Sequence, residues 1–229
     1  MGNPNYQLLV DAAKLLRPIL GELVFVGGCS TGLLVTDRAA ANVRPTTDVD
    51  AIAEITSYVG YIELSERLKK LGFREDAREG APRCRWRQNT TTLDVMPVDG
   101  TLFGFRNVWY GPAVKTAEIR ELQADLSIRL VNSVYFCASK LEAFHDRGRG
   151  DYFGSRDLEM SFPWLTAGKN CLGNFARLRA TCVPTLLMSS ENCMTRGSFR
   201  MHFQDIYLRM QQAKSESGRS SRGSRKSLP

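Results

Sequence analysis

Two aspartates that lie two residues apart in a strand-like segment constrain this chain most. Apolar and polar residues alternate over residues 48–55, a period of two that predicts a β-strand. Successive side chains of a strand point to opposite faces, so Asp48 and Asp50 share one face while Val49 points into the core. Two carboxylates this close repel each other unless a cation or a proton lies between them. One face of this strand must therefore be open to a cation or a proton.

A pair of glycines follows an earlier apolar segment. Residues 23–26 form an apolar run of strand length, Gly27 and Gly28 come directly after it, and residues 30–35 are expected to form a short helix. Glycine has no Cβ, so the backbone can approach a phosphate closely, and the start of a helix directs N–H groups toward an anion. Ser30 or Thr31 can add a hydroxyl donor. A glycine pair also suits an ordinary turn, and only its combination with the acids favours a phosphate site.

A third carboxylate, Asp94, lies in the apolar segment 93–97, where a buried strand has no structural need of an acid. Carboxylate oxygens are hard ligands that suit Mg²⁺, or Mn²⁺ in its place. Three acids on two neighbouring strands can hold two metal ions, one to activate an attacking hydroxyl and one to bind a triphosphate. We therefore predict Asp48, Asp50 and Asp94 as catalytic and metal-binding residues.

The other segments indicate an α/β (α+β) fold, a mixed twisted sheet flanked by helices. Hairpins are predicted from residues 83–87 with 91–97, and from 118–122 with 126–130. Helices are predicted over residues 6–20, after a cap at Thr56 or Ser57, and over 134–145. Trp86 is interpreted as hairpin packing. Cys29 is read as a small buried residue, although a helix start can lower the pKa of a thiol.

The cysteine content indicates the redox environment of the protein, and its charge is distributed unevenly along the chain. Six cysteines without a Cys-x-x-Cys pair indicate a reduced, cytoplasmic environment, and no apolar run is long enough for a bilayer, so no membrane partner is expected. The net charge is +7, but residues 160–229 contain eleven of the 31 basic and three of the 24 acidic residues. That segment carries +8 and residues 1–159 carry −1. The basic character therefore belongs to the tail.

With these motifs in place, the chain resembles the AbiEii/AbiGii-type nucleotidyltransferases, a branch of the DNA polymerase β-like superfamily. The resemblance covers roughly residues 5–159. It rests on the motif segments 25–34 (Phe-Val-Gly-Gly-Cys-Ser-Thr-Gly-Leu-Leu), 44–50 (Arg-Pro-Thr-Thr-Asp-Val-Asp), 93–96 (Leu-Asp-Val-Met), 140–151 (Lys-Leu-Glu-Ala-Phe-His-Asp-Arg-Gly-Arg-Gly-Asp) and 156–159 (Arg-Asp-Leu-Glu). It implies a nucleotidyltransferase fold for residues 1–159.

The resemblance also implies an activity: metal-dependent transfer of a nucleoside monophosphate from a nucleoside triphosphate to an acceptor. The acceptor is left open between RNA, a protein and a small molecule. Such enzymes are often the toxin of a toxin–antitoxin or phage-defence pair, which implies an antitoxin partner. Mapped onto this sequence, Asp48, Asp50 and Asp94 bind metal. The nucleotide-binding residues are Gly27, Gly28, Ser30, Lys140, Asp151 and Asp157. Without the resemblance, Lys140 is equally a surface lysine and Asp151 belongs to a solvated glycine turn.

From Met160 onward the sequence changes character: helical periodicity fades, serine and arginine rise, and residues 213–229 have the composition of a disordered segment. One added nucleotide before the Met160 codon allows the start of this segment to be read as Asp-Val-Ile-Ser-Val-Val-Asp-Gly-Arg-Lys-Glu-Leu, and the same shift allows later residues to be read as an amphipathic helix. We therefore interpret residues 160–229 as an out-of-frame tail created by a single-nucleotide deletion. The nucleotide sequence of the gene tests this hypothesis.

Two further functions stay open at the level of sequence. An altered tail exposes apolar surface on the preceding domain, so the protein can instead be a catalytically silent nucleotide- or partner-binding module. A basic RNA-binding protein is the third interpretation, and it rests on the charge of the tail alone. Labelled nucleoside triphosphates distinguish the first two, and deletion of residues 160–229 tests the third.

Overall fold

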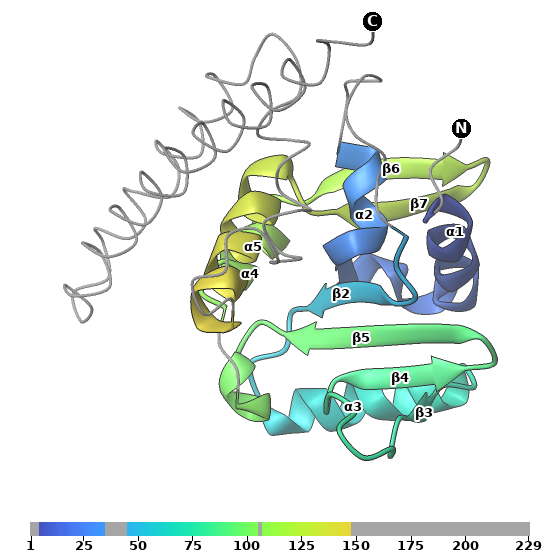
Figure 1. Ribbon diagram of the computed structural model, residues 1–229. Coiled ribbons are helices and arrows are strands. Elements are labelled where there is room, and N and C mark those ends of the chain that lie inside the picture. Colours follow the sequence, from blue (N-terminus) through green and yellow to red (C-terminus); the bar gives the residue numbers. More distant parts are fainter. Residues whose placement is uncertain (1–4, 35–44, 105–106, 148–229) are drawn as a thin grey trace, which may run out of the picture. The chain divides into compact units, whose positions relative to one another are not determined.

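A seven-stranded mixed sheet forms the centre of the described part of the chain (Figure 1). This computed structural model describes residues 5–34, 45–104 and 107–147. The strand order is β3-β4-β5-β2-β1-β7-β6. The strands are β1 (Leu23–Val26), β2 (Val49–Ala53), β3 (Arg74–Glu75), β4 (Arg85–Gln88), β5 (Thr91–Pro97), β6 (Glu118–Gln123) and β7 (Leu126–Leu130). The predicted mixed sheet is confirmed.

The central strands combine both pairing directions. β2 pairs antiparallel with β1 and parallel with β5, and β1 pairs parallel with β7. Both predicted hairpins are confirmed, as the antiparallel pairs β4–β5 and β6–β7. The turn between β4 and β5 places Asn89 at φ 51°, a left-handed conformation that asparagine adopts more readily than most residues. The motif-bearing strands β1, β2 and β5 are therefore adjacent in the middle of the sheet.

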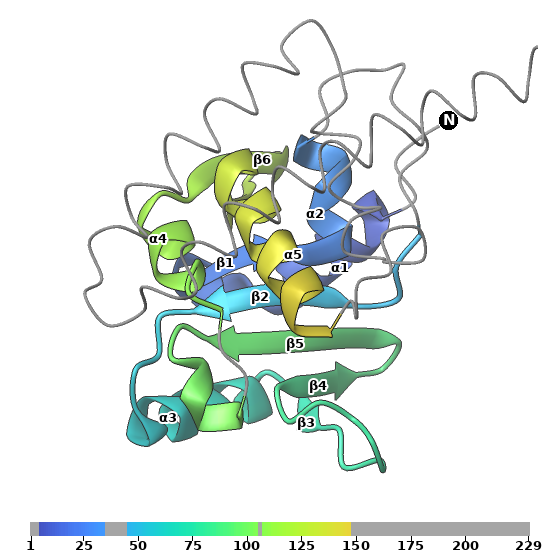
Figure 2. The same cartoon turned by 60° about the vertical axis from the view of Figure 1, so that its left-hand side comes forward.

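Helices flank this sheet. They are α1 (Tyr6–Leu15), α2 (Gly27–Leu34), α3 (Tyr58–Lys70), α4 (Tyr110–Lys115) and α5 (Ser133–Arg147), with 3₁₀ turns at Arg17–Glu22 and Gly100–Phe103. α3 runs behind β3 and β4 in the view of Figure 1, whereas α5 crosses in front of β1 and β2 in Figure 2. α5 therefore lies over the strands that carry the predicted site.

Three helix boundaries depend on local chemistry. The helix predicted over residues 6–20 ends at Leu15, and a 3₁₀ turn containing Pro18 follows, because proline has no N–H and clashes with the preceding helical turn. α2 begins at Gly27, three residues before the predicted start. Ser57 is the N-cap of α3, where its hydroxyl accepts the N–H of Gly60 at 3.2 Å, as predicted.

The face of the sheet opposite the acids is buried. Val49, Leu93 and Trp86 occupy paired positions across β2, β5 and β4, Phe25 of β1 pairs with Ala51 of β2, and none of these residues is exposed to solvent. The packing role predicted for Trp86 is confirmed. Among the described helices, none combines the length and the apolar character that a membrane span requires. The predicted domain boundary at residue 159 and the tail lie outside the described residues.

Candidate functional site

The parallel pairing of β2 and β5 brings the acidic motifs together. Asp50 and Asp94 are register partners, so their side chains leave neighbouring strands on the same face. Asp48 directly precedes β2 and lies two residues from Asp50. Asp94 is buried, and Asp48 and Asp50 are partly exposed. The two acid motifs, more than forty residues apart in sequence, therefore meet at one place on the sheet.

Arg85 links two of these acids. It lies on β4 directly opposite Asp94, and its Nε and Nη2 atoms donate to the two carboxylate oxygens of Asp94, both at 2.7 Å. Nη2 also donates to Oδ2 of Asp48 at 3.0 Å. These ion pairs raise the pKa of Arg85 above its usual value, chiefly through the hydrogen bonds to Asp94. The guanidinium thus bridges Asp48 and Asp94.

The glycine turn holds the third acid. Gly27 has φ +71°, and a Cβ on this residue would lie 1.8 Å from Oδ2 of Asp50, so only glycine fits here. The N–H of Gly28, in the first turn of α2, donates to Asp50. The hydroxyl of Ser30 donates to the carbonyl of Val26 at 2.8 Å. The turn therefore accommodates a carboxylate, and the phosphate-binding role of Gly27, Gly28 and Ser30 stays a prediction.

Asp50 has an unusual protonation equilibrium. The pKa of Asp50 is raised to about 7: burial is the main cause and the charges of Asp48 and Asp94 add to the rise, whereas Lys140 and the N–H of Gly28 oppose it. Burial disfavours the charged form of a carboxyl group, and neighbouring carboxylates add to this penalty. At neutral pH Asp50 is therefore only about half ionised.

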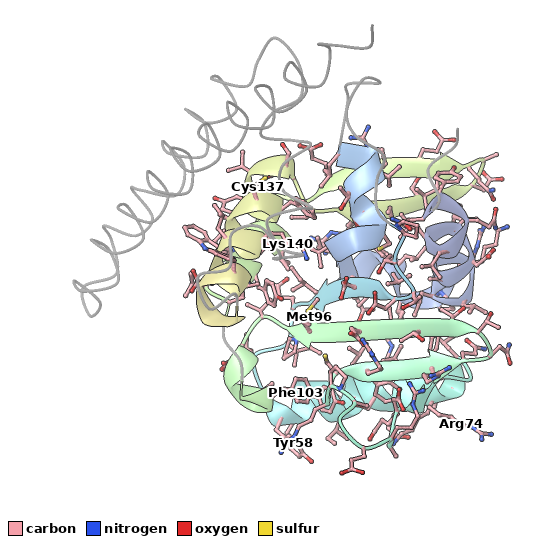
Figure 3. All side chains as sticks on the ribbon, viewed as in Figure 1. Tyr58, Arg74, Met96, Phe103, Cys137 and Lys140 are labelled. Atoms are coloured by element: carbon pink, nitrogen blue, oxygen red, sulfur yellow. The ribbon has the colours of Figure 1, made fainter. Side chains whose placement is uncertain are left out.

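Lys140 lies near the acids, and its role as a nucleotide contact stays a prediction. It extends from α5 toward the middle of the sheet (Figure 3), and its charge is the strongest influence that favours the ionised form of Asp50. Met96 follows Asp94 by two residues on the same face, and the hydroxyl of Tyr110 in α4 donates to its sulfur at 3.1 Å. α4 and α5 thus contribute side chains around the acids. Asp151 and Asp157, the other predicted nucleotide-binding residues, lie outside the described residues.

A buried asparagine ties the glycine turn to the acid motif. Asn5 donates through Nδ2 to the carbonyl of Gly28 at 3.3 Å and accepts the backbone N–H of Thr46 at 3.0 Å. The hydroxyl of Thr46 in turn donates to Oδ1 of Asp48 at 2.6 Å. Asn5 is 1% exposed, so these bonds are shielded from water. The segment before α1 therefore sets the position of Asp48 relative to α2.

Cys29 is an inert neighbour of the site. It is fully buried and donates to the carbonyl of Val26 at 3.5 Å. Burial raises the pKa of the Cys29 thiol to about 12, and the charge of Asp50 contributes to the rise. The thiol is therefore neutral at physiological pH, and the interpretation of Cys29 as a small buried residue is confirmed.

The donor set suits a hard divalent cation. Asp48, Asp50 and Asp94 supply carboxylate oxygens on one face of the sheet. Within the described residues, however, no three acidic, histidine or cysteine side chains stand in a metal-binding arrangement. The guanidinium of Arg85, bonded to Asp48 and Asp94, accounts for this, because it engages the oxygens that an ion would need.

Arg85, Asn5 and Thr46 are the site residues that sequence reasoning missed. Arg85 could have been found by counting residues back from the turn of the predicted hairpin, which places it opposite Asp94. Asn5 and Thr46 carry no such signal, because Asn5 contacts residues that are 23 and 41 positions away in sequence, Gly28 in α2 and Thr46 before β2. Only the folded arrangement reveals them.

No protein family model matches the sequence, and no curated protein matches it. Three solved structures have a related arrangement. An antigenic nucleotidyltransferase-like protein from Paracoccidioides brasiliensis is 15% identical, with a TM-score of 0.46 over 81% of this chain and 91% of that chain. The antibiotic-resistance factor ANT(2″)-Ia in solution is 13% identical, with a TM-score of 0.48 over 93% of this chain and 100% of that chain.

The third structure is the crystal structure of ANT(2″)-Ia in complex with adenylyl-2″-tobramycin. It is 16% identical to this chain, with a TM-score of 0.42 over 76% of this chain and 97% of that chain. Identities and TM-scores this low do not establish a family for the chain. The function is therefore argued from the site itself.

Proposed function

We propose that this protein is a metal-dependent nucleotidyltransferase that moves a nucleoside monophosphate from a nucleoside triphosphate to an acceptor. The observation that carries the proposal is the register of Asp50 with Asp94, next to Asp48 and against the glycine turn. Three carboxylates on one face, beside a helix start, are the residue types that metal-assisted phosphoryl transfer needs. The AbiEii/AbiGii-type resemblance of the sequence supports the same activity.

Each group has a role in the proposed reaction. Asp48, Asp50 and Asp94 would hold Mg²⁺ or Mn²⁺, and a bound ion supplies charge neutralisation at the triphosphate and activation of the acceptor hydroxyl. Lys140 would place a positive charge beside the triphosphate. Gly27, Gly28 and Ser30 are proposed to contact phosphate through the start of α2.

The acceptor and partner are proposed from the resemblance alone. RNA, a protein hydroxyl and a small molecule are the three acceptor classes, and an antitoxin is the proposed partner. EC class 2.7.7 and a cytoplasmic location belong to the same proposal. The roles of Asp151 and Asp157 in the nucleotide cleft, and the out-of-frame origin of residues 160–229, also stay proposals.

Transfer of label tests the activity. The full chain is incubated with each α-³²P-labelled nucleoside triphosphate, Mg²⁺ or Mn²⁺, and total RNA, lysate protein or small-molecule extract in parallel. We expect label on one acceptor class, and loss of transfer by about a hundredfold or more in Asp48→Ala and Asp94→Ala. Glu63→Gln is the matched control, because Glu63 is an exposed carboxylate on α3. Nucleotide binding without transfer under every condition would instead identify a silent nucleotide-binding module.

A further inference from the structure

Arg85 occupies the space between two of the proposed metal ligands. Its guanidinium makes a two-pronged contact with Asp94, at 2.7 Å for each nitrogen–oxygen pair, and reaches Oδ2 of Asp48 at 3.0 Å with Nη2. The side chains of Arg85, Asp48 and Asp94 are 23%, 28% and 10% exposed, so water screens these contacts only in part. This is a specific, partly buried arrangement and not a surface ion pair.

The guanidinium of Arg85 and a metal ion that bridges Asp48 and Asp94 cannot occupy the same position at the same time. Nη2 bonds to Oδ2 of both Asp48 and Asp94, so these two oxygens converge on a nitrogen. A divalent ion such as Mg²⁺ that bridges these two oxygens, at about 2.1 Å from each, would take the place of Nη2. The position between the two Oδ2 atoms can hold either the guanidinium or the ion, so the two compete for Asp48 and Asp94.

The next arginine on the strand lacks this role. Arg87 lies two residues beyond Arg85 on the same face of β4, opposite Thr92. It bonds to neither Asp48 nor Asp94. Arg87 therefore provides an internal comparison of equal charge on the same strand.

We propose that the guanidinium of Arg85 competes with a divalent ion for Asp48 and Asp94 and is displaced when the ion binds. This inference rests on the proposed metal-dependent function. The hydrogen bonds from the guanidinium to the two carboxylates must break before an ion bridges them. Arg85 therefore lowers the apparent affinity of the acids for the ion.

Direct measurement of Mn²⁺ binding tests this role. The full chain is titrated with Mn²⁺ and free Mn²⁺ is followed by its electron paramagnetic resonance signal. We expect Arg85→Gln to bind Mn²⁺ about tenfold to a hundredfold more tightly than the wild type, because the ion no longer breaks charge-assisted hydrogen bonds. Arg85→Lys should lie between them, since it keeps the charge and loses the two-pronged contact. Arg87→Gln should bind Mn²⁺ as the wild type does.

A purely structural role of Arg85 gives the opposite sign, because disordered acids bind the ion more weakly. Unchanged or weaker Mn²⁺ binding in a folded Arg85→Gln variant overturns the inference, and so does equal tightening in Arg87→Gln. If Arg85→Gln does not fold, Arg85→Lys decides by the same criterion. Absence of Mn²⁺ binding in every variant also overturns it. Label transfer by the wild type is measured separately. The transferase proposal can therefore hold when the proposal for Arg85 fails, and the proposal for Arg85 can hold when label transfer is not found.

Discussion

The raised pKa of Asp50 makes the stability of the metal-free protein depend on pH. Burial, followed by the charges of Asp48 and Asp94, raises the pKa of Asp50 from 3.8 to about 7 in the folded protein. The folded state therefore holds the proton more tightly than the unfolded state. This contribution to stability is fully present below about pH 4 and is lost as the pH rises through about 7.

The expected magnitude follows from these two values. One pH unit of difference between folded and unfolded pKa corresponds to about 1.4 kcal/mol, which gives about 4 kcal/mol for Asp50. Asp50 is partly exposed, and solvent screening reduces the contribution to about 2–4 kcal/mol. Asp50→Asn keeps the shape of the side chain and an oxygen that accepts the N–H of Gly28, but it carries no charge at any pH.

Urea denaturation in the presence of EDTA checks this expectation. Asp50→Asn should exceed the wild type in free energy of unfolding by about 2–4 kcal/mol at about pH 8 and match it at about pH 4. Added Mg²⁺ should stabilise the wild type at the higher pH more than Asp50→Asn. Asp11→Asn, which removes an exposed carboxylate from α1, controls for the loss of a surface charge. Parallel pH profiles of the wild type and Asp50→Asn would refute the reasoning.

Three other substitutions probe the framework of the site, each followed by urea denaturation. Gly27→Ala places a Cβ 1.8 Å from Asp50 at φ +71° and should cost about 2–5 kcal/mol, whereas Gly80→Ala, at φ +76° with open space around it, should cost only about 1–2 kcal/mol. Asn5→Ala leaves two buried backbone groups without their partner and should cost about 2–3 kcal/mol. Ser57→Ala removes the cap of α3 and should cost about 1 kcal/mol.

Specific results would contradict each of these expectations. Equal losses in Gly27→Ala and Gly80→Ala would mean that backbone strain, and not the carboxylate of Asp50, requires the glycine. A loss below about 0.5 kcal/mol in Asn5→Ala would mean that water replaces the asparagine at both backbone groups. A Ser57→Ala variant as stable as the wild type would place the start of α3 elsewhere.

Local patterns were sufficient to predict the central strands. The alternation of apolar and polar residues around Asp50 and the apolar run before Gly27 are each complete within a few residues. A short polar turn closes the hairpin that contains Asp94. The convergence of the acids followed, because adjacent strands in register must share a face. The first helix was predicted too long, although Pro18 marks its end in the sequence: the apolar pattern continues past the proline, but the backbone changes to a 3₁₀ turn there.

The partners of the acids were harder to predict than the acids. Asp48 receives hydrogen bonds from Thr46 and Arg85, and Asn5 fixes Thr46 from the segment before α1. These contacts join irregular segments or depend on an exact hairpin register. Their residue types are common on any protein surface, so composition and periodicity give no sign of them.

A proton and a guanidinium reduce the negative charge of the three acids. A proton is favoured on Asp50, as its pKa of about 7 indicates, and a guanidinium lies between Asp48 and Asp94. Both responses place positive charge where three carboxylates would otherwise repel one another. A divalent ion would replace both at once, releasing the proton from Asp50 and the guanidinium from its partners. Ion binding should therefore tighten with rising pH in the wild type, and removal of Arg85 should leave only the proton at Asp50 in competition with the ion.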